Sequence, residues 1–325
     1  MAVSLGKTPT LQVDDTLLRD IVEGLTRELK QLPSKYHYDA LGSQLFEAIC
    51  ELPWYTITRS ERALFTHERD NIISRLSTPA TMIELGAGSG EKVSILADGL
   101  ATEQRPTVIH LIDISKSALE LATRTVGSYP SVSVVQHEET YTDGLRAAVH
   151  GLGGDHPAMV LFLGSNIGNL SADAAGLFLS ELRAQLRPGD SFLLGADLVK
   201  AEADLIAAYN DPLGVTAAFN LNMLVRINRE LDADFDVAQF IHRVVWNAQD
   251  ASVESYLVSE RDQTVCITRA GCCVRLAAGE AIWTESSHKY EPDQLVSMGE
   301  AAGFRHGAQW IEPSAAFALT LFEVS

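Results

Sequence analysis

The sequence predicts an α/β protein built on a parallel, doubly wound sheet. Between residues 81 and 198, short apolar runs alternate with segments of helical periodicity, a pattern typical of such a sheet. The first run ends in a glycine-rich turn, which is a usual place for a ligand in this fold class. The chain closes with two more apolar runs around a short Pro/Ser turn, which predict an antiparallel hairpin at the sheet edge.

Each element is predicted from its local pattern. Buried strands of a parallel sheet are apolar runs of four to eight residues, and the helices between them are amphipathic. The predicted strands are residues 81–85, 107–114, 132–137, 158–165 and 191–198, with the hairpin at 304–311 and 316–324. The predicted helices are residues 91–100, 115–126 and 171–186.

Two regions do not follow this alternation. Residues 1–60 are helical and rich in aromatic side chains, and residues 197–288 hold a long helix followed by alternating strands. We therefore predict two discontinuous domains. Residues 61–196 and 289–325 form the sheet domain, and residues 1–60 and 197–288 form a second, α+β domain.

Composition narrows the class of protein. The chain has 325 residues, is 46% hydrophobic and carries a formal net charge of −18. Such a charge repels phosphate backbones and anionic lipid, so we expect no nucleic-acid or membrane partner. The N-terminus lacks the pattern of a secretory signal, and no segment is apolar for long enough to cross a bilayer. A cytoplasmic protein is expected, with a monomer favoured.

The four cysteines predict neither a disulfide framework nor a metal site. They are Cys50, Cys266, Cys272 and Cys273. Their spacing does not match a zinc motif, and buried thiols in a reducing compartment are the expected state.

The glycine-rich turn "IELGAGSGEK" predicts a nucleotide site. Gly86 and Gly88 allow a tight turn and a close approach of the ligand, and Asp113 ends the next strand, where an acid can bind ribose hydroxyls. The spacing is GxGxG rather than GxGxxG, and Glu91 adds negative charge early in the helix. Both features favour S-adenosylmethionine over a pyrophosphate-containing dinucleotide. An ordinary strand–helix turn with a surface aspartate is the alternative.

Four stretches carry a resemblance to a known family: "LPSKYHYDALGSQLFEAICELPWYTITRSE", "IELGAGSGEK", "LFLGSNIGNL" and "LAAGEAIWTESSHKY". Together they resemble the histidine-specific Nα-methyltransferases of ergothioneine biosynthesis. The resemblance implies a class I S-adenosylmethionine-dependent methyltransferase fold, Rossmann-like, with an inserted substrate-binding domain. It also implies three methylations of the α-amino group of L-histidine, which give hercynine.

The resemblance implies a set of site residues. Those implied for the cofactor are Gly86, Lys92 and Asp113, with Gly88 in the same turn, and Thr140 and Tyr141 where bacterial members have an Asp–Phe pair against the adenine. Glu138 or Glu139 is an alternative replacement for that aspartate. Those implied for the amino acid are Tyr55, Asn169, Tyr209, Glu285 and Ser287, with Tyr38 near the amine and Gly164 beside the transfer site.

Ring recognition rests on Glu285 and Ser287, which alternate on one face if "WTESSHKY" is a strand. A carboxylate and a hydroxyl could bind both nitrogens of an imidazole, with Glu285 accepting an N–H and favouring ring protonation. A solvated edge strand is the alternative. Ser255, where bacterial members have a methionine near the ring, and segments closer to fungal relatives leave tryptophan open as a substrate.

The other side chains have structural alternatives. Asn169 could hold the carboxylate and amine of an amino acid through its amide, or satisfy a turn. The tyrosines could be core aromatics with polar tips. His37 and His288 are expected to be structural. We expect no metal and no dedicated base, with Tyr38 and Asn169 positioning the amine. A nicotinamide-dependent oxidoreductase and a non-catalytic module are the alternatives from other classes.

Overall fold

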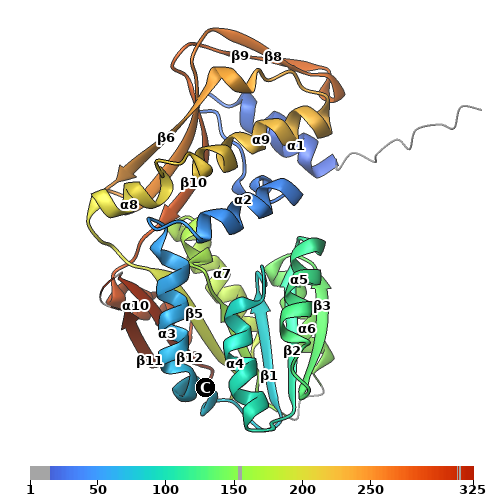
Figure 1. Cartoon of the computed structure of the whole chain (residues 1–325), viewed down its shortest axis with the longest axis vertical. Helices are drawn as coiled ribbons and strands as arrows, with labels where there is room; N and C mark the ends of the chain where they lie inside the picture. Colours follow the sequence, from blue (N-terminus) through green and yellow to red (C-terminus); the bar gives the residue numbers. More distant parts are fainter. Residues whose placement is uncertain (1–14, 153–155, 313, 315) are drawn as a thin grey trace, which may run out of the picture. The chain divides into compact units, whose positions relative to one another are not determined.

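The computed structural model describes residues 15–152, 156–312, 314 and 316–325, which form two compact units (Figure 1). The sheet unit comprises Tyr38–Thr216, Val244–Glu254 and Ser286–Ser325. The second unit comprises the described residues up to His37 together with Ala217–Arg243 and Ser255–Glu285.

The sheet unit contains the predicted doubly wound sheet. In the described part of the chain its strand order is β11-β12-β5-β4-β1-β2-β3. The strands β1 to β5 are mutually parallel, and β12 pairs antiparallel with both β5 and β11. The strands are β1 (Ala80–Leu85), β2 (Thr107–Asp113), β3 (Val132–Glu138), β4 (Met159–Phe162), β5 (Ser191–Asp197), β11 (Arg305–Glu312) and β12 (Phe317–Glu323). The predicted sheet and its antiparallel edge hairpin are confirmed.

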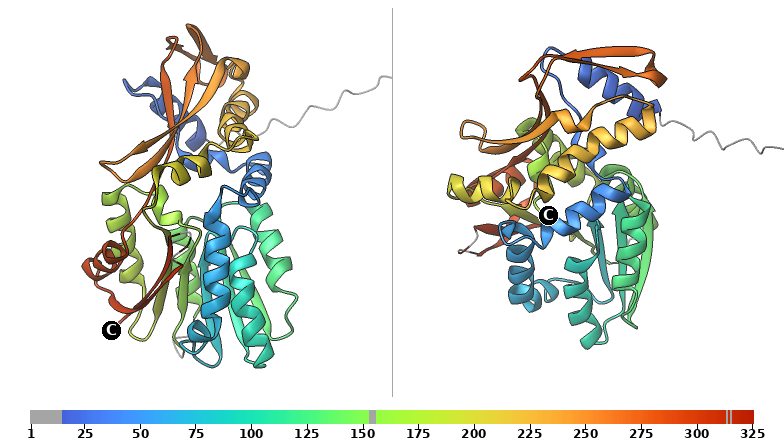
Figure 2. Two further views of the ribbon diagram at one scale, coloured as in Figure 1. Left: turned by 60° about the vertical axis from the view of Figure 1, so that its left-hand side comes forward. Right: turned by 45° about the horizontal axis from the view of Figure 1, so that its top comes forward.

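Helices cover both faces of this sheet (Figure 2). On one face α4 packs between α3 and α5, and on the other α7 packs between α6 and α10. The helices are α3 (Thr56–Ile73), α4 (Glu91–Thr102), α5 (Lys116–Val126), α6 (Tyr141–Gly151), α7 (Ala172–Gln185) and α10 (Pro292–Ala301). Two further helices of this unit are α2 (Ala40–Cys50) and α8 (Glu202–Tyr209). The predicted helices at 91–100, 115–126 and 171–186 are confirmed.

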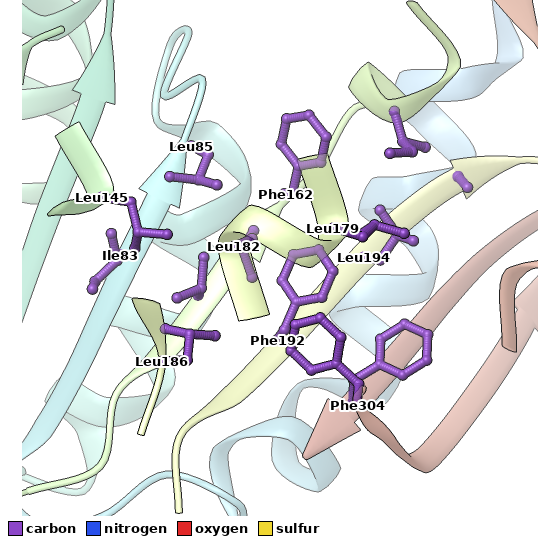
Figure 3. Close-up of a cluster of buried hydrophobic side chains, with 14 of the residues drawn as sticks. Ile83, Leu85, Leu145, Phe162, Leu179, Leu182, Leu186, Phe192, Leu194 and Phe304 are labelled. Carbon is purple, nitrogen blue, oxygen red and sulfur yellow. The ribbon is translucent and has the colours of Figure 1, made fainter. Parts of the chain in front are cut away.

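The core beneath α6, α7 and α10 is built from alternate strand residues (Figure 3). Ile83 and Leu85 of β1 and Phe162 of β4 are fully buried in it, together with Leu179 and Leu182 of α7. Burying a side chain of this size stabilises the fold by roughly 1.5–3 kcal/mol. Because successive strand side chains point to opposite faces, the residue between Ile83 and Leu85 faces the α3–α4 layer instead.

The second unit has its own core, formed by α1 (Asp15–Thr26), α9 (Val215–Leu231) and strands. Among the described residues, β10 (Ala281–His288), β7 (Ser252–Ser259) and β6 (Phe240–Asn247) form a three-stranded sheet, and β8 (Gln263–Ile267) pairs with β9 (Cys272–Leu276). The predicted long helix and the alternating strands that follow it are confirmed.

One expectation about the cysteines is wrong. Cys266 and Cys273 form a disulfide, whereas Cys50 and Cys272 are free thiols. The physical reason is the register of the β8–β9 hairpin, which places Cys266 directly opposite Cys273. Spacing along the sequence does not reveal this pairing.

The boundaries of the two units also differ from those predicted. Residues 38–60, 197–216, 244–254 and 286–288 belong to the sheet unit. Part of the reason is that α3 packs against α4, β11 and β12. Within the described residues, no helix combines the length and apolar character needed to cross a membrane.

Candidate active site

The glycine turn after β1 is held by the end of β2. Gly86 has a φ of +79° and donates its N–H to the carbonyl of Ile112 at 2.8 Å. The carboxylate of Asp113 accepts the N–H of Gly88 at 3.1 Å and that of Ser115 at 2.8 Å. Burial raises the pKa of Asp113, although these backbone donors oppose the shift. A carboxylate has about four acceptor positions, so Asp113 keeps capacity for ligand hydroxyls.

Two side chains lie close to Gly86. A Cβ at this position would lie 3.1 Å from Asn166 Nδ2 and 3.3 Å from the Tyr141 hydroxyl. The Tyr141 ring packs edge-on against Phe162, with 5.2 Å between centroids, and burial raises its pKa. Tyr141 therefore lies by the glycine turn. Asn166 was not predicted, although it stands in the quoted stretch "LFLGSNIGNL".

Thr140 has a local role in the structure. It is the N-cap of α6, and its Oγ1 accepts the backbone N–H of Asp143 at 3.4 Å. The same hydroxyl donates to the Asp143 carboxylate at 2.9 Å. An N-cap satisfies a backbone donor that the helix itself leaves unpaired. The donor hydrogen of Thr140 and one of its two acceptor positions are thus used within the first turn of the helix.

A partly buried ion pair lies at the ends of β4 and β5. Glu61 of α3 is fully buried, and both its oxygens accept the N–H of Gly164, at 2.8 and 3.0 Å. Lys92 Nζ lies 3.1 Å from Glu61 Oε2. A Cβ at Gly195 would overlap Glu61 Oε1, and one at Gly164 would lie 2.8 Å from Lys92 Nζ. Two glycines therefore make room for this pair, and Glu61 was missed by the sequence analysis.

Glu84 is a second buried carboxyl group beside this pair. It is the residue between Ile83 and Leu85, and burial raises its pKa to about 8 although Lys92 opposes the shift. Its Oε2 has no hydrogen-bond partner among the residues that the structure describes. Burial alone would lower the pKa of Lys92, but Glu61 and Glu84 outweigh it and raise that pKa. A buried polar atom without a partner is costly, so Glu84 marks a place where a ligand can bind.

The turn after β4 explains why the strand ends in small polar residues. Gly164 has a φ of +74° and Ser165 a φ of +59°, so the chain reverses through two left-handed residues. Ser165 Oγ accepts the N–H of Asp197 at 3.0 Å. A Cβ at Gly168 would lie 2.7 Å from the carbonyl oxygen of His288. Asn169, the next residue, is exposed at the end of this turn.

Three of the predicted tyrosines form a row in the sheet unit. Tyr38 lies edge-on to Phe46 with 5.6 Å between centroids, and Phe46 lies edge-on to Tyr55 at 6.2 Å. Tyr55 lies edge-on to Tyr209, again at 6.2 Å. The structure thus brings Tyr38, Tyr55 and Tyr209 together. An aromatic row of this kind offers ring faces and hydroxyls to a cationic or polar ligand.

Tyr209 ends this row in a buried hydrogen-bond network. Its hydroxyl donates to Ser287 Oγ at 2.8 Å, and Lys289 Nζ donates to Tyr209 at 2.8 Å and to Ser287 at 2.9 Å. Lys289 Nζ also lies 3.1 Å from Asp197 Oδ2. Lys200 donates to the other oxygen of Asp197 at 2.6 Å. Lys289 and Asp197 were not predicted, although Lys289 stands in the quoted "SSHKY".

The remaining predicted residues belong to the second unit or serve the fold. Glu285 is half-buried and stands two positions before Ser287 on β10, so their side chains share a strand face. Ser255 is buried on β7, and its carbonyl accepts the Thr284 hydroxyl at 3.0 Å. Buried His37 bonds Ser34 and Asn220 and stacks on Phe219, the structural role expected for it.

Comparison with known proteins matches nearly the whole chain. A family model described as histidine-specific, S-adenosylmethionine-dependent methyltransferase matches residues 17–324. The chain belongs to this family. It is therefore an S-adenosylmethionine-dependent methyltransferase, as predicted.

Individual relatives of this methyltransferase differ in their substrates. It is 38% identical to a histidine N-alpha-methyltransferase of Mycolicibacterium smegmatis, with 94% of each chain covered. It is 29% identical to ergothioneine biosynthesis protein 1 of Neurospora crassa, which covers 86% of this chain and 32% of that protein. It is 27% identical to an L-tryptophan methyltransferase of Psilocybe serbica, over 97% of this chain and 93% of that protein.

The residues around the glycine turn fit the cofactor of this methyltransferase family. Within the described part of the chain, no atom lies within 4 Å of a Cβ built at Gly88, so the turn is open there. The unpartnered oxygen of Glu84 suits an ammonium group, and the spare acceptor capacity of Asp113 suits ribose hydroxyls. These groups are carboxylates, which accept hydrogen bonds and carry negative charge. They therefore suit a positively charged ligand better than a phosphate group.

Proposed function

We propose that this methyltransferase transfers three methyl groups to the α-amino nitrogen of L-histidine and so forms hercynine, the first step of ergothioneine biosynthesis. The observation that carries the proposal is the match to the histidine-specific family over residues 17–324. It is supported by the contacts that join Tyr55, Tyr209 and Ser287 in one unit.

S-adenosylmethionine supplies a methyl group activated on a sulfonium, and the protein supplies the binding groups around it. Asp113 would accept the ribose hydroxyls, while Gly86 and Gly88 let the backbone approach. Glu84 would pair with the ammonium of the methionyl part. Lys92 pairs with Glu61, so toward the cofactor Lys92 would balance the negative charge of Glu61 and Glu84. Tyr141 lies beside Gly86, close to the same turn.

The amino acid must present a neutral amine to the methyl group. Tyr38 and Asn169 are the groups we assign to hold the amine in line, and the proton leaves to water. Positioning of this kind can supply a large part of a rate enhancement without an acid–base pair. Tyr55 and Tyr209 would contact the carboxylate and the successive methylammonium forms.

The ring of the substrate would lie along β10. Glu285 would accept a ring N–H, and Ser287 would bind the second nitrogen. An indole has one N–H and no second ring nitrogen, so tryptophan would leave Ser287 unpaired. A site built to hydrogen-bond a substrate rejects analogues that lack the bonding group.

The test is mass spectrometry of the purified protein incubated with S-adenosylmethionine and an equimolar mixture of the twenty L-amino acids. The expected result is a gain of three methyl groups on histidine alone. Methylation of tryptophan or another amino acid would contradict the assignment of the ring pocket and leave the methyltransferase activity intact. Absence of any methylated amino acid would overturn the proposed function.

The matched variants are Tyr209→Phe and Tyr256→Phe. Tyr209→Phe removes the hydroxyl that bonds Ser287 and should lower the rate of histidine methylation. Tyr256 carries its own cation contact with Arg243 in the second unit and has no assigned part in the site. Its variant should keep the rate of the unmodified protein.

A further inference from the structure

The hydroxyl of Ser287 receives two hydrogen bonds. Tyr209 donates to Ser287 Oγ at 2.8 Å and Lys289 Nζ donates to it at 2.9 Å. A serine hydroxyl has two acceptor positions and one donor hydrogen. Both acceptor positions are thus occupied inside the protein, and the only function that Ser287 can still offer is its own O–H.

Lys289 fixes the direction of the hydrogen bonds in this network. Its ammonium has three hydrogens, which go to Ser287, to Tyr209 and to Asp197 Oδ2 at 2.9, 2.8 and 3.1 Å. An ammonium cannot accept, so these bonds cannot reverse. The Tyr209 oxygen accepts from Lys289, and the Tyr209 O–H is donated to Ser287. The Lys289 side chain is completely buried, so water does not compete for these positions.

The geometry points to a donor-only Ser287, positioned by Lys289, which selects a substrate ring atom that accepts a hydrogen bond: the unprotonated nitrogen of a neutral imidazole. This inference rests on the proposed function, since it concerns the ring of the methylated amino acid. A protonated imidazolium has two N–H groups and no acceptor, so one of its N–H groups would face the Ser287 O–H. Two opposed donors leave buried groups unpaired, which is strongly unfavourable.

Several titratable or charged groups face Ser287. They are Tyr209 from α8, Lys289 after β10, and through Lys289 the Asp197–Lys200 pair, with Glu285 two positions earlier on β10. Burial raises the pKa of Tyr209. Burial alone would lower the pKa of Lys289, but Tyr209 and Asp197 raise it above its ordinary value. Tyr209 therefore stays protonated and Lys289 stays charged while a histidine ring titrates.

The first test compares the pH dependence of kcat/KM for L-histidine and for β-(1,2,4-triazol-3-yl)-L-alanine, whose ring stays neutral in mildly acidic solution. The shared α-amino group cancels in the ratio of the two values. The ratio should fall about tenfold per pH unit below about pH 6.5, where imidazole becomes protonated. A flat ratio, with both compounds methylated, overturns this inference alone. If histidine gains no methyl group at any pH, the proposed function fails and the inference fails with it.

A second measurement reads the ring directly. Histidine labelled with ¹⁵N in the ring is bound to the protein together with S-adenosylhomocysteine at pH 6. One pyridine-type and one pyrrole-type nitrogen resonance are expected. Two pyrrole-type resonances would show a bound imidazolium and overturn the inference.

Variants separate positioning from folding. Lys289→Met frees one acceptor position of Ser287, so the hydroxyl can turn, and the pH dependence of the ratio should weaken. Lys289→Arg keeps charged N–H donors and should restore it. Lys35→Met is the control, since Lys35 is exposed and pairs with Asp20 in the second unit, and the ratio should keep its pH dependence.

Ser287→Ala tests the inference without removing a buried charge. This variant deletes the donor, so kcat/KM for histidine should fall about tenfold, the size of one hydrogen bond of about 1.4 kcal/mol. The ratio should then become independent of pH. A ratio that keeps its pH dependence in Ser287→Ala would overturn the inference.

Discussion

The sheet unit holds two buried charge clusters that differ in how completely their polar atoms are paired. The cofactor cluster, which consists of Glu61, Glu84 and Lys92, has two carboxyl groups for one ammonium and leaves Glu84 Oε2 without a partner among the described residues. In the substrate cluster, which consists of Asp197, Lys289 and Lys200, all three hydrogens of Lys289 are used.

The difference separates two tasks. An incompletely paired cluster with an excess of carboxyl groups can bind a cationic ligand. The unpaired carboxyl oxygen is unfavourable in the protein without ligand, and binding of the ligand relieves this. An ammonium group whose three hydrogens are all used, as in Lys289, takes up no further acceptor, but it fixes the direction of the hydroxyl groups around it. The first cluster thus suits a cofactor that carries positive charge, and the second suits a site that discriminates between rings.

The largest effect on stability is expected from Glu61→Ala. The change leaves Lys92, whose side chain is 24% exposed, without its partner and Gly164 N–H without an acceptor. Breaking a buried pair costs about 3–5 kcal/mol of unfolding free energy. Urea denaturation measures it, with Arg62→Ala as the control, because Arg62 forms an exposed pair with Glu91 that contributes at most about 1 kcal/mol. Equal losses in the two variants would contradict a structural role for the cofactor cluster.

The pH dependence of stability should be dominated by Glu84. Its folded pKa of about 8 lies above the ordinary value of 4.5, so the folded state binds the proton more tightly than the unfolded state. The contribution is complete below about pH 4.5 and is lost as pH rises through about 8. In the protein without cofactor, unfolding free energy should fall by a few kcal/mol between pH 5 and 8. Glu84→Gln should flatten this decline, and an unchanged decline would refute the assignment.

The same carboxyl group predicts proton release on cofactor binding. A cationic ligand beside Glu84 favours its ionised form, so binding of S-adenosylhomocysteine at pH 7 should release protons. Titration calorimetry in two buffers of different ionisation enthalpy measures the release. Glu84→Gln should abolish the buffer dependence, whereas Glu47→Gln, at another carboxyl group whose pKa burial raises, should keep it.

A smaller effect is expected where the backbone makes room for Glu61. A methyl group at Gly195 would overlap Glu61 Oε1, so Gly195→Ala should lower the unfolding free energy by about 1–3 kcal/mol. Gly176→Ala is the matched control on α7, since no atom of the described residues lies within 4 Å of its added Cβ. The control should be neutral or stabilise the protein by up to about 1 kcal/mol. A stabilising effect of Gly195→Ala together with a destabilising effect of Gly176→Ala would mean that Glu61 does not lie against Gly195.

The smallest effect concerns the cap of α6. Thr140→Ala removes the N-cap of the helix and should reduce stability by about 1 kcal/mol. Ser171→Ala, which removes the cap of α7, should have a similar effect on stability. If Thr140 also binds the adenine, its variant alone should raise the Kd for S-adenosylhomocysteine.

Local signals predicted much of the sheet and the glycine turn. A strand, a glycine-rich turn and a helix are adjacent in the sequence, so Gly86, Gly88 and Asp113 can be interpreted within a window of some thirty residues. Glu84 was missed although it interrupts an apolar strand, because the interruption shows neither its orphaned oxygen nor its raised pKa.

Contacts between distant segments could not be predicted in the same way. Glu61 and Gly164 are 103 positions apart, and Lys289 reaches Asp197 across a comparable separation. The Cys266–Cys273 disulfide depends on the register of one hairpin. Tyr55, Tyr209 and Ser287 were proposed from a family resemblance, because nothing in the local pattern distinguishes them from ordinary core residues.

The central claim is that Glu285 and a donor-only Ser287 select the imidazole of histidine. The most direct measurement is competition between equimolar L-histidine and L-tryptophan for methyl groups from S-adenosylmethionine, followed by mass spectrometry. The account predicts a ratio of kcat/KM values of at least about a hundred in favour of histidine, since an indole leaves buried hydrogen-bonding groups unpaired. Equal or preferred methylation of tryptophan would contradict it.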